Sequence, residues 1–502
     1  MTQRNGSDRA DRRPAINPFL PLSVCIADGE PHVFGDRVYL FGSHDRPGGE
    51  TFCELDYELW SAPTDDLGNW KSHGIIYSAR QDPGYSERKP YLFAPDAVRG
   101  NDGRFYLYYA LAGRRGKHGY EGPISVAVCD RPDGKYEYLG FVKNPDGTPY
   151  RERILFDPAV LNDEGVIRLY FGTSYFFDEH KHFPTKLLYQ YIESKIFDRS
   201  FKELQEAKEN LTGAYTVRLA DDMLTVISEP KLVVPTETAG TAFAGHAFFE
   251  AASIRKLRGR YYFIYSSRNN HELCYAVSDR PDEGFAYGGT IISNGDIGYH
   301  GRKPKDRLNL TGNNHGSIEE IDGKLYVFYH RMTDKSTYSR QACAEEICIG
   351  QDGRIEQVEM SCCGLNGGPL PAQGEYPAAM ACVLTNGHMP HLTNGKLDRK
   401  LPCITWWDGQ AVVADIGDGT TVGYRSFLFS GGERLELELT GDFQGAIRIL
   451  TELGGAAKAE LPVNRGEAPL PVPLELEGAR PLYLNFRGQG TAVLRTLRFL
   501  AR

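Results

Sequence analysis

The sequence predicts an all-β protein in which a five-bladed β-propeller is followed by a β-sandwich. The chain has 502 residues, too many for one ordinary core, so two domains are expected. It is rich in Tyr (29), Phe (25), Gly (55) and Pro (29), a composition typical of many short strands joined by turns. A short pattern recurs along the first 360 residues, and a different strand pattern follows it.

The recurring pattern is a polar residue that enters a strand, a turn, and then an aromatic-rich strand. Its five copies begin at Asp28, Asp96, Asp157, Glu250 and His315. The aromatic strands that follow are 38–43, 105–109, 167–171, 261–265 and 325–329. The period is about 60–70 residues with one longer step after Asp157, which indicates an internal repeat. Four-stranded units repeated radially form a propeller, and the starts of its innermost strands converge at one mouth.

The domain boundaries follow from composition. Residues 1–16 are polar and charged, so we expect a disordered N-terminus. The propeller is expected over 17–360, and the Gly- and Pro-rich stretch 361–375 is predicted to be a linker. Residues 376–502 contain short alternating strands of the kind that form a two-sheet sandwich.

The bulk numbers exclude several classes of partner. The net charge is −9 and no basic stripe stands out, so no nucleic-acid partner is expected. No run of 18 apolar residues exists, so no membrane span is expected. The ten Cys form no CxxC pair and the N-terminus lacks an apolar signal region, which together favour the cytoplasm. No feature predicts an oligomeric state.

Glu250 is the candidate general acid. It follows Phe248 and Phe249, and a carboxyl group in apolar surroundings loses solvation and has its pKa raised. A raised pKa is what a general acid needs near neutral pH. Asp28 and Asp157 begin other copies of the pattern, so the three carboxylates are expected at one mouth. Glycoside hydrolysis needs two such groups across the bond, and a third raises the pKa of the acid.

Several motifs together resemble glycoside hydrolase family 43. They are Ala27-Asp28, 93–96, 156–160, 249–256, 314–317 and 329–331. The resemblance covers about residues 17–360, and its specificity lies in the order and spacing of the motifs. It implies a five-bladed propeller, an inverting mechanism, and exo-acting β-xylosidase or α-L-arabinofuranosidase activity on xylo- or arabino-oligosaccharides.

The resemblance also implies roles for individual residues. Asp28 would be the general base, Glu250 the general acid, and Asp157 the group that orients the acid and tunes its pKa. His315 resembles a channel histidine that lies near a bound calcium ion, so calcium is the implied cofactor. Family members often have Ala-Asp-Pro at the base, whereas this chain has Ala-Asp-Gly-Glu-Pro at 27–31. Glu30 therefore competes with Asp28; the preceding Ala27 favours Asp28.

Five further residues are candidate substrate contacts: His32, Asp96, His330, Arg331 and Arg340. Each of them could instead make a purely structural hydrogen bond. For Asp96 a structural role, bracing its blade, is the favoured interpretation. His44-Asp45 is interpreted as a turn at the rim.

The C-terminal sandwich resembles the carbohydrate-binding modules attached to this family, most clearly at 423–427. Trp406 and Trp407 are candidates for a sugar platform, but neighbours on a strand face opposite ways. The alternative is a module that packs against the propeller and binds no ligand.

Two other functions stay open at this point. A propeller can be a non-catalytic platform for glycans or proteins. A phosphorylase of a related family would need basic residues beside the acid, where only Arg255 and Lys256 follow Glu250.

Overall fold

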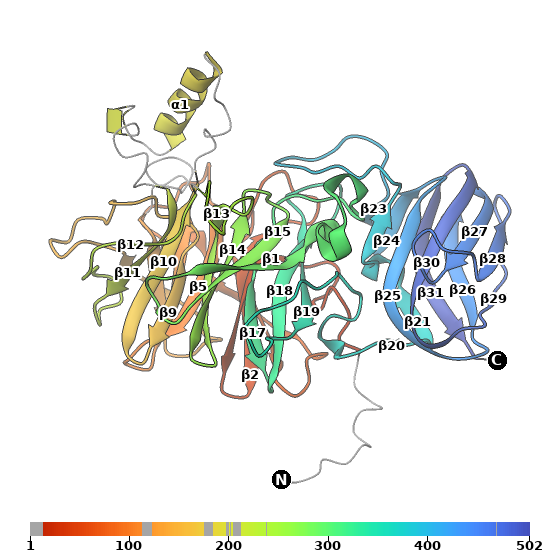
Figure 1. The fold of residues 1–502 in the computed structure, drawn as a ribbon, viewed down its shortest axis with the longest axis horizontal. Helices are drawn as coiled ribbons and strands as arrows, with labels where there is room; N and C mark the ends of the chain where they lie inside the picture. Colours follow the sequence, from red (N-terminus) through yellow and green to blue (C-terminus); the bar gives the residue numbers. More distant parts are fainter. Residues whose placement is uncertain are drawn as a thin grey trace, which may run out of the picture.

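Five antiparallel sheets follow one another along the first two-thirds of the chain in the computed structural model (Figure 1). The structure describes residues 14–112, 123–174, 184–196, 200, 202–203, 212–236, 238–467 and 469–501. Residues 1–13, most of the predicted disordered N-terminus, lie outside the described ranges, whereas Ala15 is buried. The prediction of an all-β propeller followed by a β-sandwich is confirmed.

The first two sheets have four strands each. The first sheet contains β1 (Cys25–Phe34), β2 (Arg37–Asp45), β3 (Tyr57–Pro63) and β4 (Lys71–Tyr77). The second contains β5 (Leu92–Arg99), β6 (Phe105–Leu111), β7 (Ser125–Cys129) and β8 (Glu137–Phe141).

The next three sheets continue the same order. The third contains β9 (Ala159–Asp163), β10 (Val166–Thr173), β11 (Gly213–Leu219) and β12 (Lys231–Val234). The fourth contains β13 (Phe248–Leu257), β14 (Arg260–Ser267), β15 (Glu272–Ser278) and β16 (Ala286–Ser293). The fifth contains β17 (Ser317–Ile321), β18 (Lys324–Met332) and β19 (Arg340–Ile347).

The first strands of the five sheets form a closed ring. β1 contacts β5, β5 contacts β9, β9 contacts β13, β13 contacts β17, and β17 contacts β1. An isolated bridge between Gly29 and Gly316 joins the two ends of this ring. The start of the chain also lies along the last sheet, because Asn17 exchanges hydrogen bonds of 2.8 and 3.0 Å with the backbone of Ala344. The ring places the start of each first strand around a common axis.

Tight turns join the first two strands of three sheets. Both central residues have positive φ in Glu164-Gly165 (54° and 94°), Arg258-Gly259 (51° and 80°) and Asp322-Gly323 (49° and 78°). Two consecutive residues of this kind form the turn whose twist matches that of the flanking strands. The second residue is Gly each time because it adopts a positive φ without strain from a Cβ.

The first strands are irregular near the axis. The register shifts between Ala27 and Glu30 in β1, between Phe93 and Asp96 in β5, and on both sides of Glu250 in β13. Such bulges change the direction in which side chains point and are common beside active sites.

The C-terminal domain consists of two packed six-stranded sheets. One contains β20 (Leu370–Pro371), β22 (Val383–Thr385), β25 (Thr421–Ser430), β27 (Gln444–Leu450), β28 (Ala459–Val463) and β30 (Glu477–Gln489). The other contains β21 (Gly374–Pro377), β23 (Cys403–Trp407), β24 (Gln410–Ile416), β26 (Arg434–Gly441), β29 (Val472–Pro473) and β31 (Ala492–Leu500). Their facing side chains form one apolar core, as sheets in a sandwich do.

The segment predicted as a linker belongs largely to this sandwich. β20 pairs in parallel with β25, and Cys362 and Leu370 are fully buried in the sandwich core. Gly and Pro are abundant here because the chain turns sharply between short strands, and this composition does not distinguish such turns from a tether.

Helical structure is sparse. The helix α1 (Thr185–Ile196) lies in the connection between β10 and β11, and Figure 1 shows it projecting from the propeller. The short 3₁₀ turns are η1 (Ala79–Gln81), η3 (Asn294–Asp296), η4 (Tyr299–Gly301), η5 (Pro304–Asp306), η6 (Gly364–Asn366) and η7 (Ala378–Met380). Within the described ranges, no helix has the length and apolar character needed to cross a bilayer.

Buried polar contacts join the two domains. Arg425 Nη1 lies 2.6 Å from Asp296 Oδ2, and both side chains are almost completely buried. Arg331 Nη1 donates to the carbonyl of Ala381 over 2.9 Å. Tyr424 and Phe427, in the stretch that resembles a carbohydrate-binding module, are fully buried. That stretch therefore serves the core and the domain junction instead of an exposed sugar site.

Candidate active site

One pocket of about 90 Å³ brings the three predicted catalytic carboxylates together. It is lined by Asp28, Phe52, Cys53, Phe93, Ala94, Phe156, Asp157, Phe249, Glu250, Asn270, Asn313, His315, Arg340, Thr393 and Asn394. The carboxylates come from the starts of β1, β9 and β13, as the repeat pattern predicts for the mouth of a propeller. The aromatic rings give the pocket apolar walls around these charges.

Asp28 is held as a carboxylate by a buried arginine. Its Oδ1 lies 2.7 Å from Arg340 Nη1, and its side chain is almost completely buried. Burial has the largest single effect and raises the pKa of Asp28, but the Arg340 guanidinium group, the two neighbouring histidines and Ser43 together outweigh it and lower the pKa to about 2. Asp28 is thus ionised at neutral pH, the state that a general base requires.

Arg340 is itself oriented by a second carboxylate. Its Nε and Nη2 donate to the two oxygens of Asp45 over 2.7 and 3.0 Å. Asp45 lies in β2 and is fully buried, so the interpretation of His44-Asp45 as a rim turn is wrong. Arg340 does line the pocket, but its contacts assign it to the positioning of Asp28.

Two buried histidines lie beside Asp28. His330 Nδ1 accepts the Asp28 backbone N–H over 3.4 Å, and its Nε2 lies 3.0 Å from the carbonyl of Asn313. His315 Nδ1 lies 3.7 Å from Asp28 and 3.8 Å from Asp157. Burial lowers the pKa of His330 to about 3 and that of His315 to about 4. Both rings are therefore neutral, and His330 supports Asp28 from behind without lining the pocket.

Glu250 has the opposite electrostatic environment. Burial raises its pKa first and the charge of Asp28 raises it further, to about 8, against a lowering effect of Arg340. Phe249 lines the same pocket and Phe248 is fully buried beside it. Glu250 consequently keeps its proton at neutral pH, as the two adjacent Phe residues predict.

Asp157 interacts electrostatically with both of the other two carboxylates. Its Oδ2 accepts the backbone N–H of Ala251 over 3.0 Å, which ties it to the residue next to Glu250. Burial raises the pKa of Asp157 well above its ordinary value, and the charges of Glu250 and Asp28 add to this. Asp28 and Asp157 share a left-handed backbone, with φ of 55° and 44°. The same local conformation places both side chains in the pocket.

Glu30 does not line the pocket. It lies deeper along β1, where Arg255 Nη2 and Ser253 Oγ contact its Oε2 at 2.9 and 3.2 Å. Burial raises its pKa to about 8. The bulge between Ala27 and Glu30 separates the two candidates and aims Asp28 at the pocket. The order of Asp28 and Glu30 in the sequence does not show which side chain enters the pocket. Only the bulge in β1 shows that it is Asp28.

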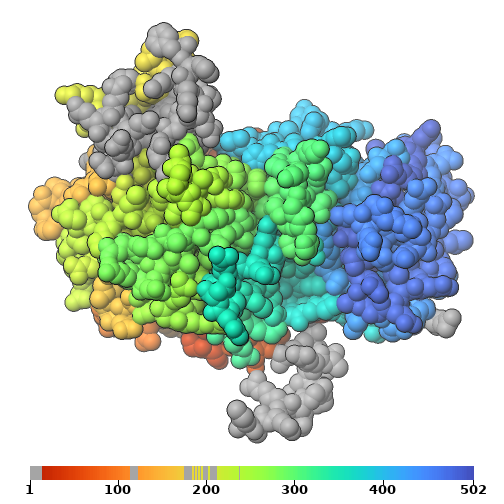
Figure 2. Space-filling view, viewed as in Figure 1, coloured from red at the N-terminus to blue at the C-terminus, as the bar shows by residue number. Residues whose placement is uncertain are grey.

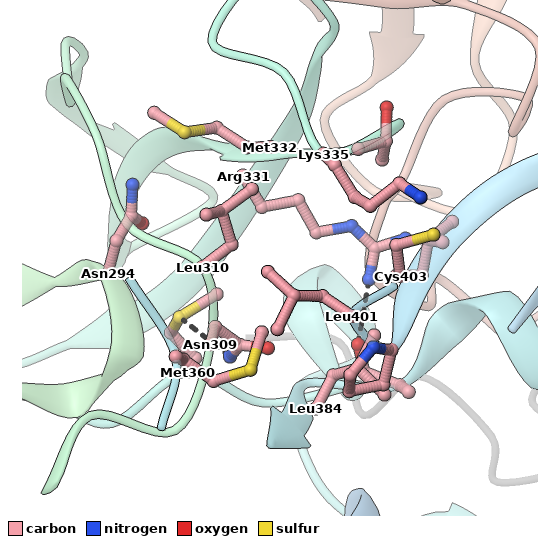
Figure 3. A pocket seen from close by; sticks show the side chains of 15 residues that line it. Asn294, Asn309, Leu310, Arg331, Met332, Lys335, Met360, Leu384, Leu401 and Cys403 are labelled. Atoms are coloured by element: carbon pink, nitrogen blue, oxygen red, sulfur yellow. Dashed lines mark hydrogen bonds between the residues drawn. The ribbon is translucent and has the colours of Figure 1, made fainter. Parts of the chain in front are cut away.

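Three of the predicted substrate contacts lie elsewhere. His32 Nε2 lies 2.6 Å from Asp96 Oδ1, and the fully buried Asp96 also accepts the backbone N–H groups of Ala97 and Val160. Asp96 thus braces β5 against β9. Arg331 lines a separate cavity of about 30 Å³ between propeller and sandwich, which Figure 3 shows with Met332, Met360 and Leu401 around it. None of these three side chains borders the pocket that contains Glu250.

Residues 26–355 match the family model of "Glycosyl hydrolases family 43". The chain belongs to this family. The matched range contains the three pocket carboxylates and all five propeller sheets, so the family membership applies to the domain that carries the site. The protein is a glycoside hydrolase.

Relatives of family 43 match this chain over two different lengths. A "Xylosidase/arabinosidase" of Thermoclostridium stercorarium is 41% identical and covers 97% of this chain and 98% of its own length. A "Xylosidase/arabinosidase" of Bacteroides ovatus is 29% identical and covers 68% of this chain and 97% of its own. A solved structure, the β-xylosidase/α-arabinofuranosidase CoXyl43 from a compost metagenome, in complex with xylotriose and calcium-free, is 27% identical. It covers 69% of this chain and 97% of its own, with a TM-score of 0.50.

Sequence reasoning missed several pocket residues of this family 43 enzyme. Asn270 and Asn313 each place a buried side-chain oxygen at the pocket without a hydrogen-bond partner among the described residues. Phe52 lies under the guanidinium group of Arg340, 4.8 Å from its ring centroid. Thr393 and Asn394 come from the C-terminal domain. Asn313 opens the fifth copy of the repeat, just before His315, but no repeat or motif marks the other positions, because they lie in loops between the strands.

Among the described residues, two groups are close enough to share a metal ion: Glu30, His32 and Asp96, and His246, Glu272 and Cys274. His315, the residue implied for calcium, belongs to neither. Glu272 already accepts hydrogen bonds from His246, Ser267, Asn269 and Thr290. Glu30 Oε1, by contrast, is buried without a partner. Of the two groups, the one that contains Glu30 therefore has an oxygen left for a hard cation.

Proposed function

We propose that this glycosidase is an inverting exo-acting enzyme that releases xylose, arabinose or both from xylo- or arabino-oligosaccharides. Glu250 acts as general acid, Asp28 as general base, and Asp157 orients Glu250 and tunes its pKa. The proposal rests on two pKa shifts of opposite direction in one pocket. The pKa of Asp28 is lowered to about 2, and the pKa of Glu250 is raised to about 8. Such divergence identifies the base and the acid of a pair.

The chemistry follows from these protonation states. The protonated Glu250 gives its proton to the leaving glycosidic oxygen while the Asp28 carboxylate takes a proton from the attacking water. The transfer of one proton at each group leaves Glu250 ionised and Asp28 protonated. Arg340 keeps Asp28 charged before the reaction, and the contact of Asp157 with the Ala251 N–H holds the strand that carries Glu250.

The size and lining of the pocket support an exo action on a small sugar. Its volume of about 90 Å³ is well below the roughly 300–1,000 Å³ of sites for drug-sized ligands. Asn270 and Asn313 line the pocket, and their amide groups can exchange hydrogen bonds with sugar hydroxyl groups. The names of the two relatives, both "Xylosidase/arabinosidase", favour pentose substrates for this chain as well.

Proton NMR of the first product tests the mechanism. Hydrolysis of a β-xyloside should release α-xylose before mutarotation, and 4-nitrophenyl α-L-arabinofuranoside assayed beside the β-xyloside gives the substrate preference. Initial release of β-xylose would contradict the inverting assignment. Absence of turnover on either substrate class would contradict the proposed specificity.

The other two functions are not supported. Membership of a glycoside hydrolase family argues against the hypothesis that the propeller is a non-catalytic binding platform. A phosphorylase would need free cations beside Glu250, whereas Arg255 contacts Glu30 and Glu319, and Lys256 Nζ contacts Asp163 and Glu164. Both cations are already paired with carboxylates.

We also propose a calcium ion in the channel, near His315. Four buried carboxylates, those of Asp28, Asp157, Glu30 and Asp96, lie around two buried guanidinium groups, those of Arg340 and Arg255, and one Glu30 oxygen has no partner. Oxygen donors of this kind fit calcium; Glu30 would offer it the unpaired oxygen, and His315 is the channel residue near which the family resemblance implies the ion. When bound, the ion would supply positive charge that offsets these carboxylates. Metal analysis of the purified protein, and the melting temperature with and without chelator in wild type and His315→Ala, test this. Equal melting temperatures in all four samples would contradict it.

A cytoplasmic location is proposed on the basis of the cysteines. All ten are unpaired, and seven of them are buried, as thiols of a reducing compartment are. Cell fractionation with an antibody tests the location, and recovery of the enzyme in the culture medium would contradict it.

A further inference from the structure

A segment of the C-terminal domain reaches the catalytic pocket. Residues 386–402, here called the strap, connect β22 in one sheet of the sandwich to β23 in the other. Figure 1 shows this light-blue stretch extending from the sandwich toward the propeller, and Figure 2 shows the same colour against the propeller surface. Thr393 and Asn394, in the middle of the strap, line the pocket with Asp28 and Glu250.

The strap is anchored to the propeller on both sides of these two residues. Before them, Leu392 N donates to the carbonyl of Thr311 over 2.7 Å, and His391 Nδ1 lies 3.0 Å from Thr311 Oγ1. After them, Gly395 and Thr337 exchange backbone and side-chain hydrogen bonds of 3.0 Å. Hydrogen bonds made by the residues just before and just after Thr393 and Asn394 therefore fix these two residues over the pocket.

Both propeller anchors belong to the fifth sheet or its entry. Thr311 precedes β17, and Thr337 lies between β18 and β19. In the ring this sheet lies between the sheets of Glu250 and Asp28, because β17 contacts both β13 and β1. The strap consequently borders the pocket on the side between acid and base.

The two strap side chains lie at the rim, not the floor. Thr393 and Asn394 are exposed, whereas Asp28 and Asp157 are both 4% exposed. Within the described part of the chain, no side chain or backbone group hydrogen-bonds to the side chain of either residue. Their hydroxyl and amide groups are thus free to contact a bound molecule. In an exo enzyme the sugar that is cleaved off fills the pocket, and the leaving group projects past the rim.

The strap lies outside the part of the chain that defines the family. The family match ends at residue 355, and the Bacteroides ovatus relative covers only 68% of this chain while 97% of its own length is matched. The Thermoclostridium stercorarium relative covers 97% of the chain. The strap is therefore a feature that the C-terminal domain adds to a complete catalytic domain.

We propose that Thr393 and Asn394 form a binding site for the leaving saccharide, so that the sandwich domain sets the specificity for the part of the substrate beyond the cleaved bond. The inference rests on the proposed exo-glycosidase function. The Asn394 amide can donate to and accept from sugar hydroxyl groups, and Thr393 adds one hydroxyl group. An aryl leaving group without hydroxyl groups cannot use these contacts.

The test compares two substrates that share the cleaved sugar. The double variant Thr393→Ala/Asn394→Ala and wild type are assayed on xylobiose and on 4-nitrophenyl β-xyloside. Loss of two hydrogen bonds should lower the ratio of kcat/KM for xylobiose to that for the aryl xyloside about tenfold. The matched control is Arg399→Ala, an exposed strap residue that does not line the pocket, and its ratio should equal that of wild type.

Each outcome has a distinct meaning. A wild-type ratio in the double variant, with both substrates cleaved, would overturn the leaving-group site and leave the proposed function standing. A wild-type enzyme that cleaves neither these xylosides nor the matching pair of arabinobiose and 4-nitrophenyl α-L-arabinofuranoside would overturn the proposed function, and this inference with it. A shared loss on both substrates with no change of the ratio would assign the strap to the shape of the pocket and so overturn the inference.

Discussion

Arg340 Nη1 lies 2.7 Å from Asp28 Oδ1, and the same guanidinium group makes a two-pronged contact with Asp45. The arginine is 2% exposed. In such low-dielectric surroundings the guanidinium group is the strongest of the groups that lower the pKa of Asp28, and it also lowers the pKa of Glu250. The protonation states of Asp28 and Glu250 are thus linked through one residue from the last propeller strand.

Replacing Arg340 with Lys should move the acidic limb of the kcat/KM profile to higher pH. Lysine is a single point of charge that cannot contact both Asp28 and Asp45 as the guanidinium does. The pKa of Asp28, now about 2, would rise, so a higher pH would be needed to ionise it. The profile of the variant is compared with that of Arg104→Lys, an arginine at a distant turn. Superimposable acidic limbs in wild type and Arg340→Lys would contradict the role given to Arg340.

Glu250→Gln should lower kcat on natural oligosaccharides by about 10²–10⁴-fold, the usual contribution of general acid catalysis. On 4-nitrophenyl substrates the loss should be smaller, because that leaving group needs little protonation. Glu320→Gln, an exposed carboxyl group in β17, is the matched control. Turnover of oligosaccharides near the wild-type rate by Glu250→Gln would remove Glu250 from the mechanism.

The rate should fall as the pH rises through about 8. Glu250 must be protonated to act, and its pKa is about 8. Asp28 is already ionised far below this pH, so the plateau of kcat/KM should extend over the acidic side of neutrality. A pH profile on an oligosaccharide checks this. A basic limb near the ordinary carboxyl value would show that Glu250 does not have a raised pKa.

The same raised pKa should affect stability. Folded Glu250 holds its proton more tightly than unfolded Glu250, whose pKa is about 4.5. Between these values the unfolded state binds fewer protons, so stability decreases as the pH rises from about 4.5 to about 8. The melting temperature of wild type should therefore fall more steeply over this window than that of Glu250→Gln. Parallel curves for the two proteins would contradict the shift.

Asp296→Ala should lower the melting temperature strongly. It leaves Arg425 buried at the domain junction without its 2.6 Å partner, and breaking a buried ion pair costs about 3–5 kcal/mol. The exposed pair Arg448–Glu460 is the control, since pairs of that kind contribute about 0–1 kcal/mol. Calorimetry on Asp296→Ala and on a variant that breaks the Arg448–Glu460 pair measures the difference in melting temperature. Equal, small shifts would show that Glu359, whose Oε2 lies 3.2 Å from Arg425 Nη1, is a sufficient partner for the arginine.

The sequence predicted the hairpins and the site acids because both depend on local patterns. The turns at Arg258-Gly259 and Asp322-Gly323 are visible as residue types that accept positive φ, and Glu250 is marked by the Phe residues before it. The spacing of the copies then predicted that Asp28, Asp157 and Glu250 meet, and they line one pocket.

The remaining assignments depended on packing between distant segments. Arg331 and Arg340 both lie on strands of the last sheet, yet one contacts the sandwich and the other contacts Asp28. The bulge in β1 separates Asp28 from Glu30, and only Asp28 lines the pocket.

The sequence by itself determined the all-β class, the radial repeat and the three carboxylates, because alternation, turns and spacing are encoded by neighbouring residues. Only the tertiary structure decided the partners of those carboxylates and the place of Thr393 and Asn394 at their pocket. Residues 394 and 250 meet only when the sandwich docks on the propeller, and contacts between segments so far apart leave no periodic signal in the chain.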